Sequence, residues 1–274
     1  MIHSSLRDCS ALKTTGLLLG RMTLQKVVCR MDSVKDKIND MGAFTDSEAF
    51  LEWEEGPYCT RVQQRVMEKV SAQFTSGQKV LEVGCGKSIY LPLAKESSIA
   101  VGIDICKNFL KLNKGFERVV GDAENLSFPF SSFDYVLCMG LLHHMPDKKN
   151  ALKEIAKVCN SKIFILEPHS MSINWIYRGV RKIAIALFGF ERVKKWVGFV
   201  TPHETFISKR FVEENLSDFQ LKFTFYSPFR APPLKALNRL NFEAVNDFLE
   251  KMPGIRRMGT YMVVEGERIR GNEA

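Results

Sequence analysis

The sequence has few of the features that mark metal-stapled or disulfide-rich proteins. Its seven cysteines are an odd number, and no two of them are spaced as C-x-x-C. A disulfide framework and a zinc site are therefore disfavoured, and no other metal site is predicted. This cysteine usage fits a reducing cytoplasm, where we expect the protein to be located.

Long apolar runs are lacking as well. No stretch of about 18 uninterrupted apolar residues occurs, so the sequence predicts no transmembrane helix. The apolar stretch at residues 11–20 is short and contains Lys13, which makes it a poor signal sequence. We expect residues 1–45 to be an N-terminal extension that need not be ordered, and residues 46–274 to form one domain.

Net positive charge is absent from most of the chain and concentrated in two segments. The net charge is +8, of which residues 1–30 carry +4 and residues 172–200 carry +5. This localisation argues against nucleic acid as a partner. Residues 172–200 also contain aromatic rings, a combination that suits an anionic membrane or a lipid-like ligand, although a core helix with solvated bases is the alternative. The aromatic residues are Trp175, Tyr177, Phe188, Phe190 and Trp196.

Short apolar runs that end at glycine, aspartate or proline alternate with stretches of helical period. This alternation predicts a Rossmann-like, doubly wound α/β fold with a mostly parallel sheet and helices on both faces. The rhythm changes after Pro168, where a helical cap insertion at about 170–215 is expected as a lid between the fifth and sixth strands. The expected strands are 79–84, 99–104, 117–122, 133–140, 162–168, 219–227 and 259–266; the expected helices include 59–75, 89–97, 106–114, 146–159, 208–216 and 234–251.

The turn in residues 80–88, "VLEVGCGKS", lacks the complete pattern of two common nucleotide sites. A P-loop needs its first glycine at position 81, which is Leu81. A nicotinamide dinucleotide turn needs a third glycine at position 89, which is Ile89. What remains is a short Gly84-Cys85-Gly86 turn, which would let the backbone approach S-adenosylmethionine closely.

Three acids follow successive strands in a way that suits this ligand. Glu82 lies at the end of the first strand, where a carboxylate can meet an ammonium group. Asp104 ends the second strand and can accept hydrogen bonds from ribose hydroxyls, and Asp122 follows the third strand and can accept from an adenine amino group. Each also has a structural alternative, because aspartates cap helices and form turns. All three would meet at the edge where open α/β sheets bind ligands.

Four segments together resemble the successive motifs of class I S-adenosylmethionine-dependent methyltransferases of the type 11 group. They are "VLEVGCGKS", "VGIDI", "GDAENLSFPFSSFDYVLCMGLLHHM" and "KIFILEP", and they cover residues 78–168. The resemblance implies a seven-stranded sheet whose last strand is antiparallel. It also implies S-adenosyl-L-methionine as cofactor.

Site residues carried over from the resemblance follow the same order along the chain. The methionine part of the cofactor would lie against the first turn, the ribose at Asp104, and the adenine at the ends of the second and third strands. The residues after the fourth strand would lie under the cofactor. One departure is Ser88, where the family often has a third glycine. The residues concerned are Glu82, Gly84, Cys85, Gly86, Asp104, Ile105, Asp122, Ala123, Glu124, Met139 and Gly140.

Two histidines follow the fourth strand in "LLHHMPD". His143 and His144 are either loop residues that pack, or one of them takes a proton from the acceptor, since histidine titrates near neutral pH. His144 is the preferred catalytic candidate. Methyl transfer depends mostly on alignment, so the sequence need not contain a catalytic dyad.

The predicted function is methyl transfer to a small-molecule or lipid-like acceptor, for example a quinone or isoprenoid. An NAD(P)-dependent oxidoreductase is one alternative, because Asp104 stands at the distance expected of that fingerprint. A non-catalytic S-adenosylmethionine-binding protein is the other, since fold alone does not determine function.

Overall fold

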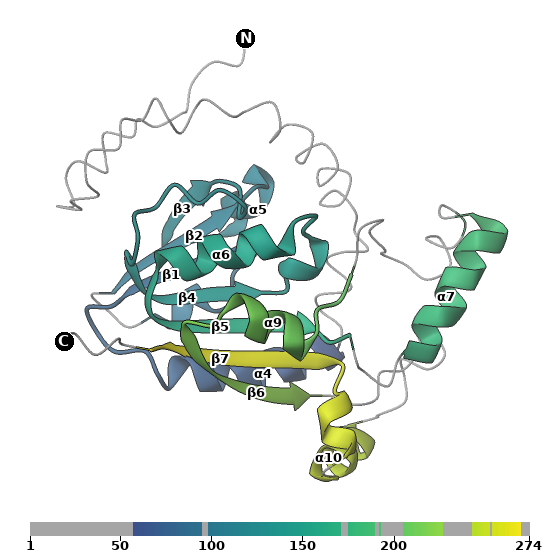
Figure 1. Cartoon of the computed structure of the whole chain (residues 1–274). Coiled ribbons are helices and arrows are strands. Elements are labelled where there is room, and N and C mark those ends of the chain that lie inside the picture. Colours follow the sequence, from purple (N-terminus) through teal and green to yellow (C-terminus); the bar gives the residue numbers. More distant parts are fainter. Residues whose placement is uncertain are drawn as a thin grey trace.

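The computed structural model describes residues 57–94, 98–170, 175–189, 192, 205–226, 243–252 and 254–269. Within these residues the chain forms one seven-stranded sheet flanked by helices (Figure 1). The strands are β1 (Lys79–Val83), β2 (Ile99–Asp104), β3 (Glu117–Val120), β4 (Phe133–Met139), β5 (Cys159–Pro168), β6 (Phe219–Tyr226) and β7 (Tyr261–Arg268). The α-helices are α4 (Pro57–Ser71), α5 (Lys107–Leu112), α6 (Lys148–Val158), α7 (Trp175–Phe188), α9 (Lys209–Asn215) and α10 (Glu243–Lys251).

The strand order is β3-β2-β1-β4-β5-β7-β6. The first five strands pair in parallel, and β7 is antiparallel to both β5 and β6. The predicted mostly parallel sheet with an antiparallel last strand is therefore confirmed. The order changes direction at β1, so the loops after β1 and β4 leave on either side of a crevice of the kind that binds ligands in such sheets.

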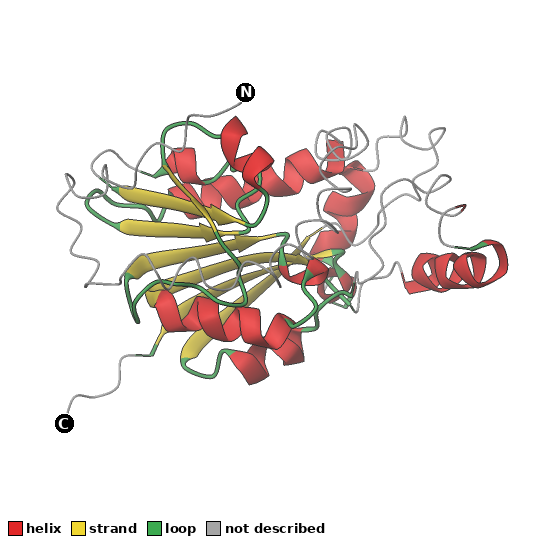
Figure 2. Cartoon of the chain, turned by 90° about the horizontal axis from the view of Figure 1, so that it is seen from above, coloured by secondary structure: helices red, strands yellow, loops and turns green. Residues whose placement is uncertain are grey.

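Successive side chains of a strand are buried on opposite faces of the sheet. Val80 belongs to a buried cluster with residues of α4 on one face, while its neighbour Leu81 belongs to the cluster on the other face, which includes residues of α6 and α9. This follows from the two-residue period of a strand. Figure 2, seen from above, shows helices on both sides of the strands. The central strands β1, β4 and β5 are apolar on both faces, as expected of parallel strands that helices cover on both sides.

The two main covering helices form for reasons visible in the sequence. In α4, Val62, Val66 and Val70 recur four residues apart and are all buried. In α6, the Asp147 side chain accepts a hydrogen bond from the backbone N–H of Asn150 at 3.0 Å, which satisfies a free donor in the first turn. The apolar stripe of α6 then packs on β4 and β5.

Not every predicted helix forms over its full range. Residues 89–97 were expected to be a helix, but only the 3-10 turn η2 (Leu91–Leu93) forms, and residues 95–97 lie outside the described residues. The hydroxyl of Ser88 accepts from the N–H of Leu91 at 3.1 Å, and the turn ends at Ala94, whose ψ of 135° is not helical. In the segment 172–200, α7 ends at Phe188 and is followed by Gly189 at φ +81°.

The insertions after β5 and β6 leave from the same edge of the sheet. Pro168, the last residue of β5, and Tyr226, the last residue of β6, both pair with Tyr261, the first residue of β7. Figure 1 shows α7 and α10 on that side of the sheet. A lid over the sheet edge remains a prediction. None of the described helices is long and apolar enough to cross a membrane.

Candidate active site

The turn after β1 is fastened to the end of β2. The backbone N–H groups of Gly84 and Cys85 donate to the carbonyl of Ile103 at 2.8 and 3.1 Å, and that of Gly86 donates to Oδ2 of Asp104 at 2.9 Å. Both glycines have positive φ, +69° at Gly84 and +46° at Gly86. Only glycine adopts these angles without strain, so the turn requires both.

Glu82 is a buried carboxyl group beneath this turn. Its side chain is 2 % exposed and accepts a hydrogen bond from the hydroxyl of Ser88. Burial raises the pKa of Glu82 to about 8, the Ser88 hydrogen bond lowers it, and nearby Asp104 raises it further. Ser88, the one departure from the family pattern, is thus the residue that solvates Glu82 inside the protein.

Asn113 also holds the turn, and the sequence analysis missed it. It follows α5 and is buried. Its Oδ1 accepts from the N–H of Ser88 at 3.0 Å, and its Nδ2 donates to the carbonyl of Gly86 at 2.5 Å. A polar residue just after a short helix gives no sequence pattern that would have singled it out.

Asp104 has both oxygens directed at backbone donors. Its Oδ1 accepts from the N–H of Cys106 at 2.7 Å, and its Oδ2 accepts from Gly86. Burial raises the pKa of Asp104, while these two hydrogen bonds lower it. Each carboxylate oxygen has a second acceptor position, so the group can still bind hydroxyls. Ile105, beside it, is partly exposed at the same edge.

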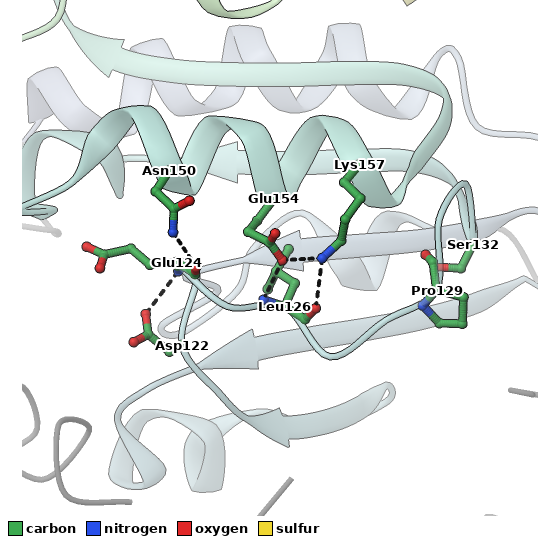
Figure 3. A network of polar contacts seen from close by, with 8 residues as sticks. All are labelled: Asp122, Glu124, Leu126, Pro129, Ser132, Asn150, Glu154 and Lys157. Carbon is green, nitrogen blue, oxygen red and sulfur yellow. Dashed lines mark hydrogen bonds and ion pairs between the residues drawn. The ribbon is translucent and has the colours of Figure 1, made fainter. Parts of the chain in front are cut away.

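The loop after β3 is tied to α6, as Figure 3 shows. Oδ1 of Asp122 accepts from the N–H of Glu124 at 2.9 Å, and Asn150 donates to the carbonyl of Glu124 at 2.6 Å. Further along, Glu154 accepts from the N–H of Leu126 at 2.9 Å. The Glu124 carboxylate accepts from the N–H of Asp147 at 3.2 Å, toward the start of α6. Ala123 is buried between these contacts.

The loop after β4 meets the turn after β1. Met139 ends β4, and Gly140 follows at φ +75°. A Cβ added to Gly84 would lie 2.6 Å from Cδ1 of Leu141, so the two loops are in contact. The 3-10 turn η3 (Leu142–His144) comes next. Its His143 is buried, with Nδ1 at 2.7 Å from Oε2 of Glu167.

His144 lies beside His143, with ring centroids 3.7 Å apart. Burial, then His143, then Lys148 lower the pKa of His144 to about 2. The ring is therefore neutral at physiological pH. Its low basicity disfavours it as a proton acceptor, because an effective general base has a pKa near the working pH.

The described residues fit S-adenosylmethionine. Glu82 is a buried carboxyl group whose ionised form a ligand ammonium group would stabilise. A Cβ built on Gly86 meets no heavy atom within 4 Å, so the turn leaves room for a ligand against its backbone. Asp104 and Asp122 lie at the ends of the next two strands as predicted. Among the described residues, no three His, Cys, Asp or Glu side chains are grouped to hold a metal ion.

The family of this domain follows from a sequence match over the same strands. The family described as "Methyltransferase domain" matches residues 81–165, about a third of the chain. The chain carries a methyltransferase domain. This domain runs from β1 to β5 and contains every predicted cofactor-binding residue. The predicted methyltransferase family is confirmed for these residues, and the match supports S-adenosylmethionine as the cofactor.

Curated relatives of the methyltransferase domain act on different acceptors. A probable tRNA methyltransferase 9B of Mus musculus is 33 % identical over 111 residues, which cover 37 % of this chain and 24 % of that protein. The demethylmenaquinone methyltransferase of Staphylococcus carnosus is 29 % identical over 161 residues, covering 55 % of this chain and 58 % of that protein. The chain thus spans less than two thirds of either relative.

Solved structures extend the similarity of fold beyond the methyltransferase domain. A SAM-dependent methyltransferase from Thermotoga maritima has a TM-score of 0.55 at 16 % identity, covering 85 % of this chain and all (100 %) of that one. One from Archaeoglobus fulgidus has a TM-score of 0.54 at 18 % identity, covering 81 % and 100 %. At such identities the match establishes the fold, which is the predicted Rossmann-like class.

Proposed function

We propose that the protein transfers a methyl group from S-adenosylmethionine to a small-molecule or lipid-like acceptor. The observation that carries this is the arrangement of Glu82, Gly86 and Asp104 around one turn at the carboxyl edge of the sheet. The turn brings a buried carboxyl group, an open stretch of backbone and a second carboxylate together. These match the ammonium group, the bulk and the ribose hydroxyls of the cofactor.

The cofactor supplies an activated methyl group on a sulfonium. The residues of the chain would bind it, orient it and exclude water. Glu82, once ionised, would neutralise the ammonium group, and Asp104 would hold the ribose. The loop from Gly140 to His144 borders the space in which the methyl group would meet its acceptor. Much of the rate enhancement then comes from alignment.

The acceptor class rests on two observations. First, the quinone-related match extends over 161 residues, whereas the tRNA-related match covers 111. Second, the insertions next to the site expose large apolar side chains. In α7, Ile183, Leu187 and Phe188 are 61, 71 and 49 % exposed, and in α10 Phe248 is 65 % exposed. We therefore favour a lipid-like quinol over tRNA.

The direct test is a thermal-shift screen with S-adenosylmethionine, S-adenosylhomocysteine, NAD and NADP. We expect stabilisation by the first two alone. Only they carry an ammonium group for Glu82, and the glycine pattern of a dinucleotide site is incomplete here. Stabilisation by NAD alone would support the oxidoreductase alternative. Cell extract incubated with protein and deuteromethyl-labelled donor is then searched by mass spectrometry for labelled quinones, lipids and nucleosides. Donor binding without any labelled product would indicate a non-catalytic binding protein.

Contact with an anionic membrane through residues 172–200 is the second part of the proposal. The helix α7 carries Arg178, Arg181 and Lys182 and no acid. Its exposed Ile183 and Leu187 lie one turn apart. A basic helix with an exposed apolar side suits the headgroup region of anionic lipid.

The apolar side of α10 supports this contact. Val245 and Phe248 lie three residues apart in α10 and are exposed, and Met252, just after the helix, is exposed as well. On another side of the helix, Glu250 is held by Arg65 of α4 at 2.7 Å. The helix thus turns a polar side to the protein body and apolar side chains to solvent, the reverse of an ordinary surface helix.

Flotation with vesicles tests the membrane contact. We expect the protein to float with phosphatidylcholine vesicles that contain phosphatidylglycerol, and less with phosphatidylcholine alone. Ile183→Asp with Leu187→Asp should abolish flotation. The matched control is Phe130→Asp, because Phe130 is 70 % exposed in the loop before β4, away from both insertions. Equal recovery with both vesicle types would exclude a charge-dependent contact.

A further inference from the structure

Glu167 is the most enclosed carboxyl group among the described residues. It lies near the carboxyl end of β5, where its side chain is 0 % exposed. A buried carboxylate is unfavourable unless hydrogen bonds replace its lost water. The partners of Glu167 therefore indicate why the residue is present.

The side chain of Glu167 is hydrogen-bonded to the loop after β4. Glu167 accepts from the backbone N–H of Leu142 at 2.6 Å and from that of His143 at 3.2 Å. The ring Nδ1 of His143 is the third contact, at 2.7 Å. The backbone adds a fourth link, because the N–H of Gly140 donates to the carbonyl of Leu166 at 2.7 Å. Glu167 thus fixes the path of this loop and the orientation of one ring in it.

The contact with the ring sets its tautomer. An ionised carboxylate can only accept, so the proton between the two groups belongs to Nδ1 of His143. A neutral ring protonated at Nδ1 carries its lone pair on Nε2. The two backbone hydrogen bonds would be enough to hold the loop on Glu167. The additional contact with the His143 ring is what points to a role in proton transfer.

The ring of His143 approaches the loop that borders the candidate site. Cε1 of His143 lies 4.0 Å from the position that a Cβ would take on Gly140. Cε1 is the ring carbon between the two nitrogens, so the nitrogen-bearing side of the ring lies toward Gly140. The adjacent Leu141 contacts Gly84 of the cofactor turn. His143 therefore lies between the carboxyl group of β5 and the space above the ends of β1 and β4.

We propose that Glu167 is a positioning residue that holds His143 with its proton on Nδ1, so that Nε2 accepts the proton of the methyl acceptor. This rests on the proposed function. In the step, the acceptor atom gives its proton to Nε2 and uses the freed electron pair to bond the methyl carbon. The carbon–sulfur bond breaks, and its electron pair remains on sulfur. His143, rather than His144, is the proton acceptor.

The tautomer can be read by two-bond ¹H–¹⁵N nuclear magnetic resonance of the histidine rings, with His143 assigned from the spectrum of His143→Gln. Wild-type protein should show Nδ1–H at His143. Glu167→Gln should move the proton to Nε2, because the amide can donate to Nδ1. Glu265→Gln is the matched control. Glu265 is a carboxylate of β7 that contacts Lys69 at 2.5 Å, away from the loop; this variant should leave the His143 signals unchanged.

Two spectroscopic outcomes would overturn the proposal. One is an Nε2–H or doubly protonated ring in wild-type protein, which requires no variant to fold. The other is no change of the His143 signals when S-adenosylhomocysteine binds, with binding verified by calorimetry. If calorimetry shows no binding, the proposed function fails, whereas the tautomer measurement still tests the role of Glu167. In cell extract with the deuteromethyl-labelled donor, Glu167→Gln should slow product formation at least tenfold, and Glu265→Gln should not. Equal rates for the two variants would contradict the role in proton transfer.

Discussion

The backbone N–H of Gly86 donates a hydrogen bond to Oδ2 of Asp104 at 2.9 Å, across 18 residues of sequence. This contact joins the turn after β1 to the end of β2. The residue expected to hold the ribose of the cofactor therefore also shapes the turn expected to hold its methionine part. Ligand binding and local stability are coupled at Asp104, and substitutions there have to separate the two.

Asp104→Asn should weaken S-adenosylmethionine binding about ten- to a hundredfold. The amide retains one acceptor oxygen but loses the charge that strengthens hydrogen bonds to ribose hydroxyls, each worth about 1.5–3 kcal/mol when charged. Calorimetry measures the affinity, and circular dichroism checks that the fold is retained. Asp134→Asn is the matched control. Asp134 accepts from the N–H of Lys79 at 2.9 Å at the opposite edge of the sheet, so affinity should not change.

Binding of S-adenosylmethionine should release a proton from Glu82. With a pKa of about 8, the carboxyl group is mostly protonated at pH 7 in the free protein, and the cationic ligand stabilises its ionised form. Calorimetry at pH 7 in buffers of different ionisation enthalpy should give a binding heat that depends on the buffer. The dependence should be much smaller in Glu82→Gln. A binding heat independent of the buffer in wild-type protein would contradict this coupling.

Stability of the free protein should fall as pH rises from about 4.5 to 8. In this window the folded state keeps a proton on Glu82 while the unfolded chain has lost it, so the folded state binds more protons. Stability then falls as pH rises toward the folded pKa. Urea unfolding at several pH values measures the slope, which should be shallower in Glu82→Gln. A slope unchanged by this substitution would show that other groups cause it.

Lys87→Ala should leave both the fold and S-adenosylmethionine affinity unchanged. Lys87 occupies the position of a P-loop lysine, yet Leu81 lies within β1 and Lys87 is exposed. No long loop wraps a phosphate here. ATP should therefore give no thermal shift in wild-type protein. A shift that is lost in Lys87→Ala would revive the P-loop interpretation.

The sequence predicted the parts of the structure that depend on local pattern. Buried strands at 79–84, 99–104 and 133–140 were predicted from apolar runs and turn residues, and the seven strands with an antiparallel last strand followed from the family resemblance. The contacts made by Asn113 and Glu167 were not predicted. Both depend on which loops meet in space, and a single polar residue after a helix or in a strand has no period that would mark it.

The ranking of His143 and His144 is not fixed by the sequence for the same reason. Adjacent histidines in a loop are equivalent in sequence, and only the fold places Glu167 beside one of them. The expected helix at 89–97 forms only the turn η2. Its apolar residues suited a helix, but Ala94 has an extended ψ of 135°, which no local pattern indicated.

Substitution of the two turn glycines should separate stability from binding. Gly84 and Gly86 both have positive φ, so alanine at either position is strained by about 1–2 kcal/mol. At Gly84 the new Cβ would also lie 2.6 Å from Leu141, so Gly84→Ala should be the more destabilising. At Gly86 the new methyl group meets no protein atom within 4 Å and projects into the space proposed for the ligand. Gly86→Ala should therefore lose most of its S-adenosylmethionine affinity for a smaller loss of stability.

The control for this pair is Gly115→Ala. Gly115 has φ +86° and open space around its Cβ position, but it precedes β3, away from the site. It should lose about as much stability as Gly86→Ala, measured by thermal unfolding, and bind S-adenosylmethionine as wild-type protein does in calorimetry. If Gly86→Ala binds as tightly as Gly115→Ala, the ligand does not lie against this turn. The cofactor site would then have to be sought elsewhere along the carboxyl edge.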